Sequence, residues 1–75
     1  MQKTLEQLRI AVALTQDQLA GKVGVNRITI ASWENGGNQP RIQYIRPLAE
    51  ALGVSFAEVY EAIEATIRQA KKNKQ

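Results

Sequence analysis

Residues 15–35 read TQDQLAGKVGVNRITIASWEN, and the architecture of the chain follows from this segment. Thr15 stands just before a run of apolar side chains at helical spacing, and its hydroxyl can accept a hydrogen bond from a free amide of a first helical turn. Gly24 follows the run and can adopt a positive φ without steric cost, which suits the end of a helix. The segment therefore predicts two short helices, residues 16–23 and 27–35, hinged at Gly24.

The second helix of this segment has two distinct faces. Asn26 can cap it, and Ile30 and Trp33, three residues apart, point toward a core. Two helices joined by a turn of three to four residues containing glycine match the description of a helix-turn-helix motif. The opposite face of the second helix is expected to stay free and comprises Arg27, Ile28, Ala31, Ser32 and Asn35.

The segment resembles the helix-turn-helix of the phage repressor and Cro proteins, also called the XRE family. The pattern Q-xxx-A-xxx-G-V-xxxx-I-xx-W carries the resemblance, at Gln16, Ala20, Gly24, Val25, Ile30 and Trp33. The likeness extends through Leu8-Arg9, Leu14-Thr15-Gln16, Trp33-Glu34-Asn35-Gly36, Pro40 and residues 48–55, so it covers roughly residues 5–60. It implies an all-α, five-helix, lambda-repressor-like DNA-binding domain.

Three further helices are expected around the motif. The first spans about 3–13 and the fourth about 42–52, where Pro47 should kink the helix or push its regular part later. The last spans about 56–70, and its apolar stripe is longer than a small bundle needs, which predicts an extended C-terminal helix. The expected buried stripes are Leu5, Leu8 and Val12; Ile42, Ile45, Leu48, Ala49 and Leu52; and Phe56, Val59, Tyr60, Ile63 and Ile67.

Length and composition narrow the class of protein. With 75 residues the chain is expected to form one domain, residues 1–70, followed by a basic, disordered tail, KKNKQ at 71–75. It contains no cysteine and no histidine, which removes disulfides, thiolate nucleophiles, the usual zinc ligands and the usual general base. No carboxylate pair, phosphate loop or nucleophile motif is recognisable, so we expect no enzyme, no metal and no other cofactor. No apolar run approaches the ~20 residues of a membrane span, and a cytoplasmic, nucleoid-associated protein without a membrane partner is expected.

The net charge of +3 is unevenly distributed along the chain. Residues 1–49 carry six basic and three acidic side chains, whereas residues 50–70 carry four glutamates against Arg68. A basic N-terminal part joined to an acidic final helix is typical of a protein with one face on a polyanion. A basic composition on its own would fit ordinary solubility equally well.

The exposed face of residues 27–35 supplies the candidates for reading DNA. A helix in the major groove contacts base edges with side chains near its N-terminus, so Arg27, Ile28 and Ser32 are expected to read bases. Gln16 stands at the N-terminus of its own helix, where free amides and the helix dipole favour a phosphate, and the resemblance gives it the same role. The further phosphate candidates are Asn26, Thr29, Asn35 and Arg41. The first three of these can equally serve only to cap or pack their own helix.

Two expectations concern packing and assembly. The resemblance implies an ion pair between Arg9 of the first helix and Glu34 of the recognition helix. One small domain makes few contacts, so a two-fold homodimer on pseudo-palindromic double-stranded DNA is expected, with half-sites roughly 34 Å apart. The last helix can pack back on the first helix or form the seam of the dimer. The dimer-surface candidates are Tyr44, Arg46, Ile63 and Ile67.

These features point to a sequence-specific, double-stranded-DNA-binding transcriptional regulator of prokaryotic, phage or plasmid type, and to a repressor in particular. An antitoxin or a restriction-modification controller of the same fold is one alternative. A protein-interaction module that has lost DNA binding is another. Such a module would show an acidic or apolar recognition face, whereas this face carries Arg27 and no acid before Glu34.

Overall fold

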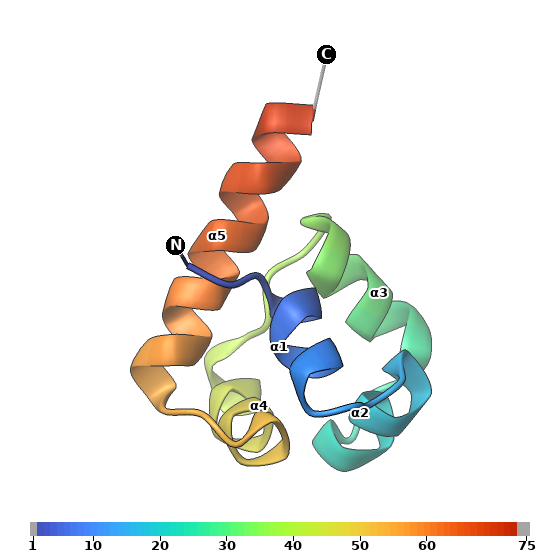
Figure 1. Cartoon of the computed structure of the whole chain (residues 1–75). Helices are drawn as coiled ribbons and strands as arrows, with labels where there is room; N and C mark the ends of the chain where they lie inside the picture. Colours follow the sequence, from blue (N-terminus) through green and yellow to red (C-terminus); the bar gives the residue numbers. More distant parts are fainter. Residues whose placement is uncertain (1, 74–75) are drawn as a thin grey trace.

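Five α-helices and one short 3-10 helix make up the computed structural model, which describes residues 2–73 (Figure 1). In chain order they are α1 (Leu5–Ala11), α2 (Gln16–Val23), α3 (Arg27–Asn35), η1 (Ile42–Tyr44), α4 (Ile45–Leu52) and α5 (Phe56–Asn73). The expected all-α fold is confirmed, and no strand occurs within the described residues. Residues 74 and 75 of the expected tail lie outside this part of the chain.

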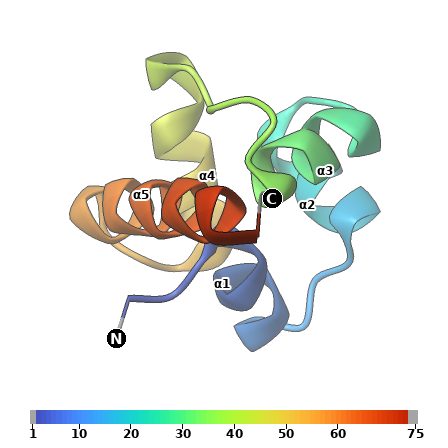
Figure 2. The same ribbon diagram turned by 90° about the horizontal axis from the view of Figure 1, so that it is seen from above.

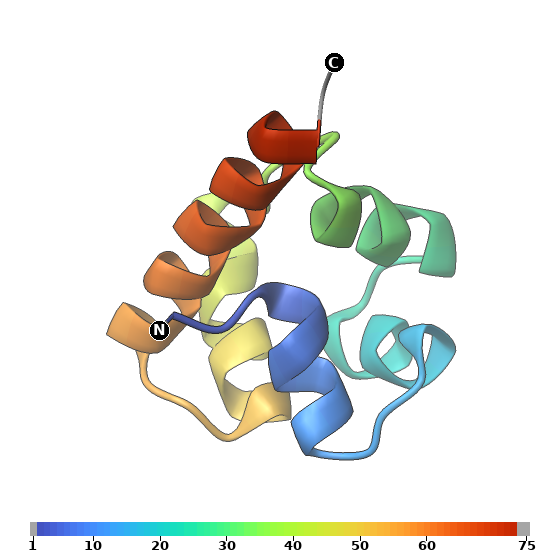
Figure 3. The same cartoon turned by 45° about the horizontal axis from the view of Figure 1, so that its top comes forward.

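One hydrophobic core fills the space between the helices. α4 and α5 lie side by side, α2 packs beneath α3, and α1 lies between these two pairs (Figures 1 and 3). The centre of the core is formed by Ile30, Leu48 and Val59, which are almost completely buried. Seen from above, α5 crosses the molecule, and its C-terminal end lies beside the end of α3 (Figure 2).

α1 is shorter at both ends than the expected span of 3–13. Thr4 caps its start, because the Thr4 hydroxyl accepts from the Gln7 amide at 3.2 Å and the Gln7 side chain accepts from the Thr4 amide at 2.9 Å. Leu5 and Leu8 are buried as expected. The reciprocal cap thus places the first turn directly against the core.

The end of α1 takes an unusual form. The amide of Ala13 donates to the carbonyl of Ile10 at 2.9 Å, and the amide of Leu14 reaches back to Arg9 at 3.2 Å, which together close the helix as a Schellman motif. Ala13 has a φ of +60°, where α2, α3 and α4 each end in glycine. Val12 becomes the C-cap and is exposed, so its expected place in the buried stripe is wrong.

Replacing Ala13 with glycine is expected to stabilise the protein by about 0.5–1 kcal/mol. A Cβ in the left-handed region costs about 1–2 kcal/mol, and glycine removes this cost. Glycine also gives the unfolded chain more conformational freedom, which cancels about 0.4–1 kcal/mol of the gain. Urea unfolding followed by circular dichroism measures the difference. Ala57→Gly is the matched control: Ala57 is exposed within α5, and there the substitution should destabilise by up to about 1 kcal/mol. An A13G variant less stable than the wild type would contradict strain at residue 13.

Pro47 determines where the fourth helix becomes regular. Residues 42–44 form η1 and the α-helix starts at Ile45, so Pro47 lies in the first turn, where its missing N–H removes no hydrogen bond. The prediction that Pro47 pushes the regular part of the helix later is confirmed. A 3-10 turn holds three residues rather than 3.6, so the stripe does not extend back to Ile42. Ile42 is exposed, and its expected burial is wrong.

α5 is longer than expected and less buried at its start. Ser55 and Glu58 form a capping box in which each side chain accepts from the other residue's amide, at 3.1 and 3.0 Å. Phe56 and Tyr60 lie in the first two turns and are about half exposed, which corrects their expected burial. The helix continues through residues 71–73, which are therefore not part of a disordered tail.

The inner face of α5 packs within the single chain. Ile63 belongs to the hydrophobic core, and Ile67 packs against that core while partly buried. Because a side chain cannot be buried in its own domain and also face a second copy, Ile63 is wrong as a dimer-surface candidate. None of the helices among the described residues combines the length and apolar character needed to cross a membrane.

Candidate nucleic-acid interface

α2 and α3 are the two arms of the helix-turn-helix. Thr15 and Gln18 form a reciprocal capping box at the start of α2, with distances of 3.0 and 2.9 Å. Gly24 ends α2 with a φ of +92°, and Asn26 starts α3 by accepting from the Thr29 amide at 2.8 Å. Both helices occupy the residues expected from the sequence, and the turn between them is three residues long.

The face of α3 that looks away from the core is open. Ile30 and Trp33 anchor the helix from behind, with only 1% and 5% of their surface exposed. On the other side Arg27 is exposed, and Ile28 has 72% of its surface in contact with solvent. The first turn of α3 therefore offers one charged and one apolar contact point next to each other.

Arg27 is only loosely held in the free protein. Among the described residues the carboxylate within 4 Å of it is that of Asp17, whose Oδ1 lies 3.9 Å from the Arg27 Nε. More than half of each side chain is exposed, and exposed pairs of this kind contribute little to stability. The Arg27 guanidinium is free to leave Asp17 for a better acceptor.

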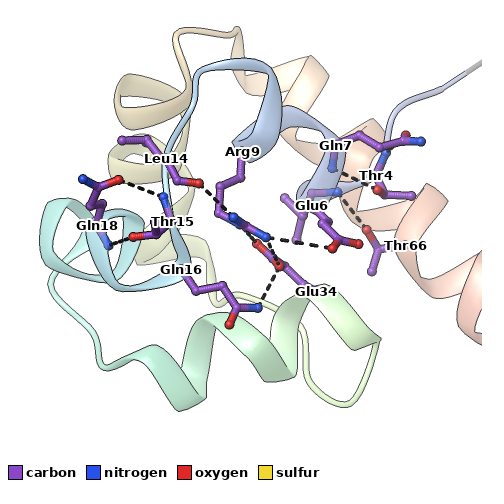
Figure 4. A network of polar contacts seen from close by, with 11 residues as sticks. Thr4, Glu6, Gln7, Arg9, Leu14, Thr15, Gln16, Gln18, Glu34 and Thr66 are labelled. Atoms are coloured by element: carbon purple, nitrogen blue, oxygen red, sulfur yellow. Dashed lines mark hydrogen bonds and ion pairs between the residues drawn. The ribbon is translucent and has the colours of Figure 1, made fainter.

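Behind the open face, one carboxylate joins the first three helices (Figure 4). Glu34 of α3 accepts two hydrogen bonds from Arg9 of α1, Nε to Oε2 at 2.6 Å and Nη2 to Oε1 at 3.1 Å. Gln16, the first residue of α2, donates from its side-chain amide to the same Oε1 at 3.0 Å. Arg9 Nη1 also donates to the carbonyl of Leu14, just before α2, at 2.8 Å. The ion pair implied by the resemblance is present, and the Glu34 carboxylate also binds α2 through Gln16.

The Arg9–Glu34 pair is largely shielded from water. The side chains of Arg9 and Glu34 are 11% and 6% exposed. The hydrogen bond to Glu34 raises the pKa of Arg9, burial lowers it, and the charges of Glu34 and Glu6 raise it further, so that its pKa lies above the ordinary value. Arg9 therefore stays charged. A planar guanidinium bound at two points fixes the angle between α1 and α3.

Two of the phosphate candidates keep free donors. Gln16 is half-buried and uses one N–H on Glu34, which leaves its second N–H at the N-terminal end of α2. Arg41 is exposed just before η1. Gln16 precedes α3 in the chain, and Arg41 follows it.

The other phosphate candidates are engaged in local contacts. Asn26 Oδ1 accepts from both the amide and the hydroxyl of Thr29, at 2.8 and 2.9 Å. Asn35 Oδ1 accepts from the Gly37 amide at 2.8 Å and so closes the end of α3. Capping is an observed use of both asparagines, and only their NH2 groups remain as donors.

Residues that the sequence did not single out lie beside α3. Asn38 donates to the Ser32 Oγ at 2.9 Å, which leaves the Ser32 hydroxyl proton for another acceptor. The amide side chains of Asn38, Gln39 and Gln43 follow α3 within eight residues and flank the expected phosphate candidate Arg41, a signal that the sequence analysis overlooked. A shallow groove is lined by Thr29, Trp33, Asn38, Gln39, Arg41, Gln43 and Tyr44.

The dimer-surface candidates do not come together on one free surface. Tyr44 packs on Trp33, with ring centroids 5.4 Å apart and an interplanar angle of 50°. Arg46 is exposed on α4. Ile67 packs partly buried against the core. Of the four candidates, Arg46 is exposed, whereas the other three are partly or fully buried.

A short turn between two capped helices, with a buried anchor on one side of the second helix and an open face on the other, defines the helix-turn-helix class. The chain belongs to the helix-turn-helix family, whose sequence profile matches residues 5–59, and the resemblance to the XRE type is thereby confirmed. The part of the protein that this chain comprises is accordingly a helix-turn-helix domain.

Three regulators illustrate where the chain stands in this family. It is 30% identical over 70 residues to the cryptic phage CTXphi transcriptional repressor RstR of Vibrio cholerae, covering 93% of this chain and 63% of RstR. It is 33% identical over 60 residues to the transcriptional activator BcrR of Enterococcus faecalis, covering 80% of this chain and 29% of BcrR. An uncharacterised helix-turn-helix regulator of Methanocaldococcus jannaschii is 33% identical over 60 residues, covering 80% of this chain and 91% of that protein. The chain thus spans less than two thirds of the first two regulators, and no solved structure matches it significantly.

Proposed function

We propose that the protein is a sequence-specific transcriptional repressor that reads the major groove with α3. The observation that carries the proposal is the open first turn of α3, where Arg27 and Ile28 project outward while Ile30 and Trp33 hold the helix from behind. A helix presented in this way fits the major groove, in which its N-terminal residues reach the base edges. Similarity to a phage repressor over 93% of the chain favours repression over activation. Such a protein would act in the cytoplasm, on the DNA of the nucleoid.

Three side chains of α3 would read bases. Arg27 donates two parallel hydrogen bonds to guanine O6 and N7, once it has left its loose contact with Asp17. Ile28 buries its exposed surface against a thymine methyl group. Ser32 offers one hydroxyl proton and discriminates weakly, because a hydroxyl suits either class of base.

Residues before and after α3 in the chain would position the helix on the phosphates. Gln16 supplies its free N–H together with the N-terminus of α2. Arg41 supplies a positive charge beside the amides of Asn38, Gln39 and Gln43, which line the same groove. Asn26, Thr29 and Asn35 contribute less, because their capping bonds already occupy part of their hydrogen-bonding capacity.

A homodimer on a pseudo-palindromic operator would complete the recognition. The chain measures 33 × 24 × 24 Å, so two copies fit side by side on half-sites roughly 34 Å apart. One copy therefore suits one half-site. Because Ile63 is buried in the core, we place the contact between copies on exposed side chains such as Arg46 and the accessible edge of Tyr44.

Arg27→Ala is expected to weaken binding to the operator by about 1–3 kcal/mol and to relax the preference at one base pair, since one bidentate contact to guanine is lost. Fluorescence anisotropy on the operator and on its single-base variants measures both effects. Lys3→Ala is the control, because Lys3 is an exposed cation that precedes α1, and its loss should leave the preference at every base pair unchanged. An equal loss on every duplex would reassign Arg27 to the phosphates.

Selection of bound sequences from a random duplex pool, at two salt concentrations, tests the proposal as a whole. A single enriched motif with two half-sites about one helical turn apart is the expected result, and the salt dependence gives the number of phosphates engaged. An enriched single half-site would contradict the dimer while leaving the reading by α3 intact. A pool with no enriched sequence at either salt concentration would reject a sequence-specific regulator in favour of a protein-interaction module.

A further inference from the structure

The second half of α5 lies against the end of the recognition helix. The family profile stops at residue 59, whereas α5 continues to Asn73. Gly36, directly after α3, approaches Ala70 so closely that a Cβ built on Gly36 would stand 2.6 Å from the Ala70 Cβ. Figures 2 and 3 show the last turns of α5 beside the end of α3. Only a residue without a side chain at position 36 and a small one at position 70 allow this approach.

A second path links the same part of α5 to α3 through α1. Thr66 is buried, and its hydroxyl accepts from the Leu5 amide at 3.0 Å while donating to the Ala62 carbonyl at 2.8 Å. Leu5 is the first residue of α1, whose Arg9 holds Glu34 of α3. The hydroxyl thus satisfies an amide that α1 cannot pair within itself.

We infer that residues 62–71 of α5 form a brace that sets the orientation of the recognition helix on DNA, with Ala70 as its positioning residue. The direct contact at Gly36 fixes the end of α3, and the contact at Thr66 fixes α1, to which α3 is tied by its ion pair. Since α3 is nine residues long, a shift of one end changes where every side chain on its open face points.

The inference deepens the proposed function and rests on it. Base contacts need side chains placed within hydrogen-bonding distance, whereas contacts to the phosphates tolerate small shifts because charge attraction varies slowly with distance. A misplaced α3 should therefore lose discrimination between sequences before it loses general affinity for DNA. A brace that only stabilises the fold would leave both unchanged in protein that is fully folded.

Ala70→Leu in the full chain tests the brace, with Ala57→Leu as the matched control on the exposed face of the same helix. Both are compared with the wild type far below their melting temperatures, after circular dichroism has shown that they are folded. For A70L we expect about a tenfold fall in the ratio of operator affinity to affinity for a scrambled duplex, with an unchanged salt dependence. A57L should retain the wild-type ratio. A folded A70L variant with the wild-type ratio would overturn the inference.

Hydrogen exchange in the DNA-free protein separates the brace from the proposed function. The Gly37 amide donates to the Ser32 carbonyl at 2.9 Å, and its exchange is expected to be about tenfold faster in A70L than in A57L. Unaltered exchange would reject the brace even if the wild type binds DNA. Failure of the wild type to select any duplex would reject the proposed function and the role of the brace on DNA, while faster exchange in A70L would still show that Ala70 holds the end of α3. If A70L does not fold, Ala70→Gly replaces it. Deleting the contacting methyl group should then lower the affinity ratio about threefold, and an unchanged ratio would reject the brace.

Discussion

Replacing Arg9 with methionine is expected to lower the free energy of unfolding by about 3–5 kcal/mol, because the Glu34 carboxylate is left buried without its cation. The stability of a chain of this length is roughly 4–11 kcal/mol, so the substitution removes a large share of it. Gln16 alone cannot compensate, since it brings a single neutral N–H to the carboxylate.

Urea unfolding of R9M, Glu34→Leu and the double variant measures this effect. The double variant is expected to be more stable than either single variant, because it leaves no unpaired charge in the interior. Arg46→Met, at an exposed position of α4, is the control and should change the stability by less than about 0.5 kcal/mol. If the losses of the two single variants simply add up in the double variant, the pair does not act as a unit.

Gly36→Ala is expected to destabilise the protein by about 2–5 kcal/mol. Two costs combine at this position: a Cβ at a φ of +82° costs about 1–2 kcal/mol, and overlap with Ala70 adds about 1–3 kcal/mol. Ala70 belongs to a packed helix, so it cannot move aside as the end of a flexible side chain could.

Gly53→Ala separates the two costs. Gly53 ends α4 with a φ of +69°, and a Cβ there would meet nothing within 4 Å. G53A should therefore show the backbone cost alone, about 1–2 kcal/mol, and the difference between the two variants in urea unfolding reports the contact with Ala70. Equal losses in G36A and G53A would mean that α5 yields to the added methyl group.

The helix-turn-helix was the part most accessible from sequence. The side chains of Thr15 and Asn26 cap the starts of α2 and α3, and Gly24 ends α2 because glycine adopts a positive φ without strain. Each boundary can therefore be predicted from the preference of a single residue type. Ile30 and Trp33 are buried because their spacing of three residues puts both on the same face of α3, which faces the core. Local chemistry and helical periodicity were sufficient for these elements.

Two of the errors arose where the backbone departs from regular geometry, and a third arose from packing between distant segments. Val12 is exposed because Ala13 adopts a positive φ and ends α1. Alanine rarely adopts this conformation, so the sequence does not predict it. Ile42 is exposed because a 3-10 turn changes the register before Pro47. Ile63 is buried because α5 packs within the chain, which depends on distant contacts rather than on its own stripe.

The assignment of DNA contacts stays a prediction in its details. The sequence identifies the face on which Arg27 and Ile28 lie, and their exposure leaves them free to act. It did not identify the amides of Asn38, Gln39 and Gln43, since short polar residues after a helix are also what an ordinary loop contains. Which base meets which side chain depends on the duplex, and selection from a random pool is the measurement that answers it.

The hydrogen bond between Leu5 and Thr66 spans 61 positions of the chain. A ribosome adds about 5–20 residues per second, so α1, α2 and α3 emerge seconds before α5. During that interval α1 lacks the acceptor for its first amide and the surface against which it packs. A nascent chain can therefore carry every side chain that would contact DNA while α3 is not yet held in place. We expect DNA binding only after α5 has been synthesised and has packed against α1 and α3.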